Sequence, residues 1–241
     1  MNLYKYSSPV NFYPLAGRLI PWFAIPAALL FAAGIFVGFF VAPADYQQGE
    51  AYRIIFIHVP AAWLGMFLYV LMAVYAGIGW AFNARLSSMM ASSISVTGAM
   101  FTFLSLVTGA FWGKPTWGTW WVWDARMTST LILMFLYIGF ISLQSSIEDP
   151  RRADRAGAVL AIVGVINIPI IYFSVQWWNT LHQGATIRLL QKPTIHGSML
   201  YALLIMLAAC WLYSVAVVLI RVRCIILERE QNAARFAEAT I

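Results

Sequence analysis

Long apolar segments alternate with short polar connections along the whole chain. Each segment has about the length that crosses the hydrocarbon core of a bilayer, which takes about 20 apolar residues in a helix. None of the segments contains Asp, Glu, Lys, Arg or His. They cover approximately residues 20–41, 59–82, 89–111, 127–147, 156–176 and 197–220. The pattern predicts an all-α integral membrane protein, with six transmembrane helices in a single domain over residues 1–241.

The composition excludes an ordinary soluble domain. Hydrophobic residues make up 62% of the chain and charged residues 10%, whereas soluble domains average about 45–50% apolar and about 25% charged residues. The net charge is +6, but the chain has no basic run of the kind that binds nucleic acid. We therefore expect no nucleic-acid partner, and we interpret the positive charge as a signal of membrane orientation.

Basic residues are distributed unequally between the two sides of the predicted membrane. The termini and the second and fourth connections hold ten Lys and Arg residues, and the other three connections hold five. Cytoplasmic segments carry the excess of Lys and Arg in membrane proteins. Both termini are therefore predicted in the cytoplasm, and the first, third and fifth connections on the outer side.

A tryptophan-rich run follows the third apolar segment. Residues 111–126 read FWGKPTWGTWWVWDAR and hold five of the eleven tryptophans in the chain. Tryptophan collects at membrane–water interfaces in general, so an aromatic belt is one interpretation. The other is a platform for a flat apolar ligand, because tryptophan offers a wide rigid face and one hydrogen-bond donor. The density of the run favours a platform, here named the tryptophan shelf: Trp117, Trp120, Trp121 and Trp123.

All three histidines fall in or beside predicted outer connections. His58 precedes the second segment, His182 lies in the last outer connection, and His196 opens the last segment. Two neutral imidazoles can bind the two axial positions of an iron held in a planar macrocycle. We assign that role to His58 and His182, and a structural role to His196.

Three charged residues accompany these histidines. Arg53 and Arg126 lie in the first and third connections, both on the predicted outer side, where their planar guanidinium groups could bind carboxylates such as haem propionates. Asp124 directly precedes the fourth segment. It suits a helix N-cap, and it could also orient a ligand or pair with Arg126. The cap is the favoured interpretation, and the roles are compatible.

Small residues and one proline predict how the helices pack. Gly34 and Gly38 form a G-x-x-x-G pair, and the third segment is rich in Ser, Thr and Gly. Small side chains let helices approach closely in a membrane, so we favour packing over a polar conduction path. Pro169 lies inside the fifth segment and predicts a kink there.

The run W-G-T-W-W-V-W-D at residues 117–124, with its flanking histidines and six predicted helices, closely resembles the signature of haem-handling proteins of cytochrome c maturation. At this length the resemblance is to the CcmC family. It implies haem b with axial His58 and His182, and a tryptophan motif from Trp117 to Asp124. It also implies the haem chaperone CcmE and the subunits CcmA, CcmB and CcmD as partners. The expected location is the bacterial inner membrane, with the site on the periplasmic side.

Three other classes of protein remain as alternatives. A small-solute transporter usually has ionisable groups within its spans, and an intramembrane hydrolase needs a catalytic set such as H-E-x-x-H at depth. The predicted spans carry neither. In a purely structural subunit, the histidines and tryptophans would be incidental. Whether the chain itself catalyses haem attachment stays open at this point.

Overall fold

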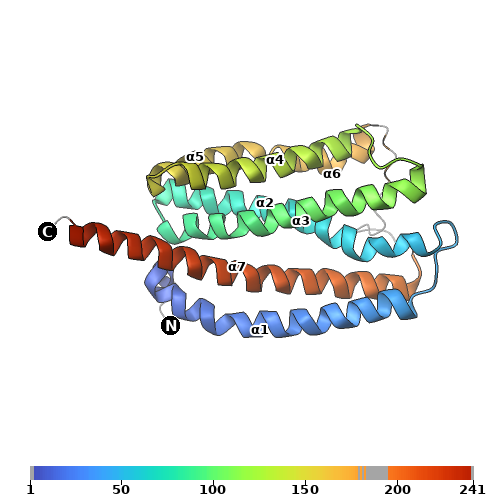
Figure 1. Ribbon diagram of the computed structural model, residues 1–241, viewed down its shortest axis with the longest axis horizontal. Coiled ribbons are helices and arrows are strands. Elements are labelled where there is room, and N and C mark those ends of the chain that lie inside the picture. Colours follow the sequence, from blue (N-terminus) through green and yellow to red (C-terminus); the bar gives the residue numbers. More distant parts are fainter. Residues whose placement is uncertain (1–2, 179, 181, 183–194, 240–241) are drawn as a thin grey trace.

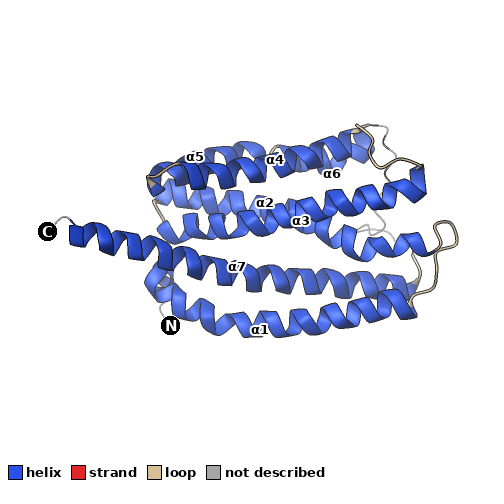
Figure 2. Ribbon diagram, in the orientation of Figure 1, coloured by secondary structure: helices blue, strands red, loops and turns tan. Residues whose placement is uncertain are grey.

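A computed structural model describes residues 3–178, 180, 182 and 195–239 of the protein. Six of its helical stretches are long and apolar enough to cross a membrane, and the described residues contain no strand (Figure 2). This confirms the predicted all-α membrane fold. The helices are α1 (Pro9–Phe36), α2 (Ile55–Phe82), α3 (Arg85–Trp117), α4 (Ala125–Ser146), α5 (Pro150–Gly164), α6 (Asn167–Trp177) and α7 (Gly197–Ala239). Shorter helical turns are η1 (Leu3–Ser7), η2 (Val37–Val41) and η3 (Glu50–Ile54).

The helices form three layers (Figure 1). α1 packs against α7, α2 packs against α3, and α4 lies with α5 and α6 on the far side of the α2–α3 layer. Both termini lie at one end of the bundle, here named the terminal end. The α1–α2 and α3–α4 connections and the end of α6 lie at the opposite end, here named the site end. The cytoplasmic location of the terminal end stays a prediction.

The fifth crossing is interrupted, and Pro169 explains where. α5 ends at Gly164 and α6 begins at Asn167. Between them the backbone N–H groups of Val165 and Ile166 donate to carbonyls three residues back, both at 3.3 Å. Because proline has no N–H and its ring crowds the carbonyl four residues earlier, the α-helical pattern fails just before it. The predicted kink is thus a break between two helices.

The helices extend beyond several of the predicted bounds. α1 begins at Pro9, because proline suits the first turn of a helix. α3 continues to Trp117 and ends where Gly118 adopts a left-handed conformation at φ 78°, which glycine adopts without a Cβ clash. Half of the tryptophan-rich run is therefore helical. α7 continues without interruption from the last apolar segment into the charged residues after Arg221.

Small residues serve close packing, as predicted. A Cβ atom on Gly34 would lie 2.6 Å from the sulfur of Met206, and one on Gly98 would lie 2.1 Å from the hydroxyl of Tyr137. That hydroxyl donates to the Gly65 carbonyl at 2.8 Å, inside the core. Several α3 hydroxyls donate to the carbonyl four residues back in the same helix, and they are thereby satisfied without water. They belong to Ser93, Thr102 and Thr108.

Candidate functional site

His58 is positioned by α3 and by the first connection of the site end. It lies in the first turn of α2, half-buried, with its Nδ1 atom 3.0 Å from the hydroxyl oxygen of Thr108. Trp112 packs edge-on against the imidazole, with ring centroids 5.6 Å apart. Its indole N–H donates to the side-chain oxygen of Gln48 at 2.8 Å. Two residues of α3 therefore contact the His58 ring, and Gln48 of the first connection holds one of them in place.

His182 is held by the segment that joins α3 to α4. Its Nδ1 atom lies 3.4 Å from a carboxylate oxygen of Asp124, and 17% of its side chain is exposed. Its ring packs against Trp117, with centroids 5.0 Å apart. The other oxygen of Asp124 accepts from the backbone N–H of Met127 at 2.7 Å. The predicted N-cap is confirmed, and the same carboxylate also reaches a histidine.

The surroundings of His182 lower its pKa. Burial is the main cause, because desolvation disfavours the charged imidazolium. The guanidinium of Arg126 lowers the pKa further, and the carboxylate of Asp124 opposes both effects. His182 is therefore neutral at pH 7, which is the state that can bind a metal.

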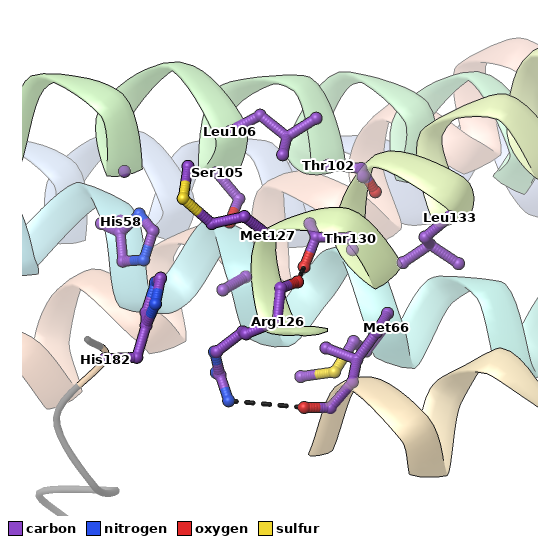
Figure 3. A pocket seen from close by; sticks show the side chains of 14 residues that line it. His58, Met66, Thr102, Ser105, Leu106, Arg126, Met127, Thr130, Leu133 and His182 are labelled. Atoms are coloured by element: carbon purple, nitrogen blue, oxygen red, sulfur yellow. Dashed lines mark hydrogen bonds between the residues drawn. The ribbon is translucent and has the colours of Figure 1, made fainter. Parts of the chain in front are cut away.

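A pocket connects the two histidines with the interior of the bundle (Figure 3). The space between its walls, including the part that is open to solvent, is about 490 Å³, and its lining comes from α2, α3, α4, α6 and His182. His58 and His182 lie next to each other at one end (Figure 3). Gly65 and Leu133 line it deeper in the bundle. The pocket thus reaches from the site end toward the middle of the helices.

Arg126 lines the same pocket and is only weakly bonded. Its guanidinium makes one hydrogen bond to the described residues, 3.5 Å long, to the carbonyl of Ile171 on α6 (Figure 3). A guanidinium group has five N–H donors. Within the part of the chain that the structure describes, most of the N–H donors of Arg126 therefore have no acceptor.

Arg53 occupies a different place from the one expected of a pocket residue. It does not line the pocket. Its guanidinium pairs with Glu50 and donates to the backbone carbonyls of Gly38 and Ala42, the latter at 3.1 Å. Gly38 lies within η2 and Ala42 directly follows it, so Arg53 ties the first crossing to η3. Its proposed role toward a propionate is not tested by these contacts.

The tryptophan shelf is partly exposed. Trp120 is 51% and Trp123 74% exposed, whereas Trp117 and Trp121 are half-buried. Trp121 packs edge-on against Trp123, with centroids 5.4 Å apart. The indole nitrogen of Trp121 is buried and has no hydrogen-bond partner among the described residues. An unpaired buried donor of this kind is a place where a ligand acceptor could bind.

His196 lies apart from the other two histidines. It is exposed, does not line the pocket, and its Nδ1 atom lies 2.8 Å from the hydroxyl of Ser198. The backbone N–H of Ser198 also donates to this atom at 3.4 Å. These contacts lie at the N-terminus of α7 and fit the structural role expected of His196.

The family model described as Heme exporter protein C matches residues 2–237. The chain belongs to the heme exporter protein C (CcmC) family. Heme exporter protein C of Escherichia coli K12 is 50% identical over 185 residues, 77% of this chain and 76% of the relative. That of Bradyrhizobium diazoefficiens is 42% identical over 240 residues, 100% of this chain and 91% of the relative. A ccmC-like mitochondrial protein named for cytochrome c biosynthesis, from Marchantia polymorpha, is 45% identical over 180 residues, 75% of this chain and 76% of the relative.

In this CcmC-family chain, sequence reasoning missed the residues that hold His58. Thr108 belongs to a segment rich in small residues and was assigned to packing. Nothing in the sequence distinguishes Gln48 from the other polar residues of its loop. Their contacts with the histidine region join positions 50 or more residues apart, and no local spacing in the sequence signals such contacts.

Proposed function

We propose that this protein holds haem b at the site end of the bundle and delivers it during cytochrome c maturation. One observation carries the proposal. His58 and His182, from segments far apart in the sequence, lie next to each other at one pocket (Figure 3). The names of the relatives, heme exporter protein C, support the same ligand.

The donor set suits haem better than a bare metal ion. Among the described residues, no group of three His, Cys, Asp or Glu side chains could hold a metal. Both histidines already use Nδ1 toward a protein oxygen, so each has its Nε2 atom left. Two nitrogen ligands suit an iron whose macrocycle supplies the other positions.

The remaining polar and aromatic groups suit the rest of a haem molecule. Haem brings an iron centre with two axial positions, a flat apolar ring and two carboxylates. Arg126 is placed to bind a propionate, because it lines the pocket with unused donors. The tryptophan shelf offers apolar ring faces, and the indole nitrogen of Trp121 offers a donor. Arg53 is kept as a second propionate ligand, with the structural role described above as its competing explanation.

Partners and location follow from the family and from the exposed surface. The chaperone CcmE would dock over Trp120 and Trp123, the exposed members of the shelf. The subunits CcmA, CcmB and CcmD would complete a transporter complex around the chain. The proposed location is the bacterial inner membrane with the site end in the periplasm, which the unequal distribution of Lys and Arg supports. In this assignment the chain binds and positions haem, without a hydrolase or redox motif of its own.

An absorbance spectrum of the purified protein with added haem tests the ligand assignment. The wild type should show a Soret band and visible bands of a six-coordinate low-spin haem. His58→Ala and His182→Ala should each change that spectrum and lower the transfer of haem to CcmE. His196→Ala is the matched control and should match the wild type. A changed spectrum for His196→Ala alone would contradict the choice of ligands, and no haem spectrum at all would contradict the function.

A further inference from the structure

The hydroxyl of Thr108 already uses its single proton in a hydrogen bond within α3. The oxygen lies 2.6 Å from the carbonyl oxygen of Leu104, one turn earlier in α3. Two oxygens at that distance repel each other unless a proton lies between them, and a carbonyl can only accept. The hydroxyl must therefore donate to Leu104.

This fixes the direction of the hydrogen bond to His58. The Nδ1 atom of His58 lies 3.0 Å from the same hydroxyl oxygen. Because the hydroxyl proton points to Leu104, the oxygen can only accept from the imidazole. The Nδ1 atom of His58 therefore carries the proton, and the Nε2 atom carries the free lone pair.

Gly109, the next residue of α3, leaves room for the His58 ring in that position. A Cβ atom there would lie 3.1 Å from Cε1 of His58 and 3.6 Å from Nδ1. The imidazole edge thus lies directly against the α3 backbone. Thr108 supplies the acceptor, and Gly109 supplies the space that lets the ring reach it.

We propose that Thr108 is a positioning residue that holds His58 as the Nδ1–H tautomer, so that its Nε2 atom is the one offered to the haem iron. The role toward iron rests on the proposed function, whereas the tautomer is a property of the protein without haem. The two histidines then differ in basicity, and therefore in how strongly each binds iron. Asp124 is an anionic acceptor for the N–H of His182 and raises the basicity of that ligand, whereas the neutral hydroxyl of Thr108 does so less for His58.

The tautomer is measured in the haem-free protein by nitrogen-15 NMR of labelled histidine, with His58→Gln identifying the His58 signals. Near neutral pH, His58 should show a protonated Nδ1 and a bare Nε2. Thr108→Val keeps the side-chain shape and removes the hydroxyl acceptor, so the ratio of the two tautomers should move toward the Nε2–H form that a histidine side chain prefers in water. Thr108→Ser should restore the wild-type ratio. A wild-type His58 with a bare Nδ1 would overturn the proposal, whatever the variants do.

The consequence for haem is measured by titration and by electron paramagnetic resonance of the ferric complex. Loss of such a supporting hydrogen bond typically weakens metal binding by about 10–100-fold, so Thr108→Val should lose about tenfold or more in haem affinity and change the low-spin signal. Thr108→Ser should stay within about twofold of the wild type. The matched control is Thr116→Val, on the same helix, whose hydroxyl also donates four residues back, at 2.7 Å to Trp112, and which does not line the pocket.

The outcomes separate this inference from the proposed function. Equal affinity and equal spectra for Thr108→Val and Thr116→Val would overturn the positioning role. A wild-type protein that binds no haem but shows the Nδ1–H tautomer at His58 would overturn the proposed function and leave the tautomer established. Restoration by Thr108→Ser in both measurements would support the whole inference.

Discussion

Arg229 at the terminal end and Arg126 at the site end use their guanidinium groups in opposite ways. At the terminal end, the guanidinium of Arg229 makes two bonds to the carboxylate of Asp154, at 2.8 and 2.9 Å, and Arg85 pairs with Glu230 at 2.8 Å. At the site end, Arg126 makes one long bond to a carbonyl among the described residues. The first arrangement joins α5 to α7 and α3 to α7. The second places a cation beside a pocket, with most of its donors unused by the described residues, and such donors are what a binding site needs.

Removal of Arg229 should have the largest effect, and it tests whether this residue serves stability alone. Its side chain and that of Asp154 are 19% and 17% exposed. Arg229→Ala leaves the largely buried carboxylate of Asp154 without its partner. Breaking such a buried pair lowers the free energy of unfolding by about 3 kcal/mol. We expect a clear drop in the thermal unfolding temperature in detergent, with haem affinity of the folded fraction unchanged. A large loss of affinity at unchanged stability would show that the terminal end is not merely structural.

Removing Arg126 should do the reverse. A hydrogen bond to a charged group contributes about 1.5–3 kcal/mol, so Arg126→Ala should lower haem affinity by about tenfold or more. Its long bond to Ile171, the one it makes to the described residues, predicts a much smaller change in unfolding temperature than for Arg229→Ala. Calorimetric titration and thermal unfolding of the same samples test both parts. Wild-type affinity in this variant would remove the propionate assignment.

Asp124 both caps α4 and contacts His182, and two substitutions separate these roles. Asparagine is also a good N-cap, whereas alanine at such a position costs about 1 kcal/mol. Asp124→Asn should therefore keep the stability of the wild type and lower haem affinity by about tenfold, through the lost carboxylate partner of His182. Asp124→Ala should lose stability as well. Equal behaviour of the two variants in both measurements would contradict this separation.

The smallest expected effect is on the pH dependence of haem affinity. The pKa of His182 is lowered from its ordinary 6.5 by burial and by Arg126. Because protonation removes the lone pair that binds iron, affinity should be constant near pH 7 and fall only below pH 6.5. Arg126→Ala removes a cause of the lowering, so His182 should protonate at a higher pH and the midpoint of the loss should move upward. A midpoint that is unchanged or moves downward would show that Arg126 does not act on His182.

The parts that the sequence could predict are those written in local patterns. The apolar segments predicted the crossings. Pro169 predicted a kink where the fifth crossing is interrupted, and the position of Asp124 just before α4 predicted its N-cap role. The placement of His58 and His182 at the same end followed from counting crossings. Their contact with one pocket needed the fold itself.

The parts that escaped prediction depend on which atoms remain unpaired after folding. The position of Arg53 in a loop gives no sign of its contacts, but the carbonyls of Gly38 and Ala42 and the carboxylate of Glu50 use its guanidinium. Thr108 looked like a packing residue, and its hydroxyl does bond within its own helix. Its second contact, to a histidine 50 residues away, has no trace in the spacing of the chain.

The break between α5 and α6 bears on how the chain enters the membrane during synthesis. Lipid offers no hydrogen-bond partners, so polar groups exposed at an interrupted span are costly until protein covers them. Asn167 at the break donates to the carbonyl of Ser129 on α4, at 2.8 Å, and is buried there. The fifth crossing therefore gains its partner from the crossing made just before it. α4 and the α5–α6 pair are best released into the bilayer together as a hairpin, with the break already covered.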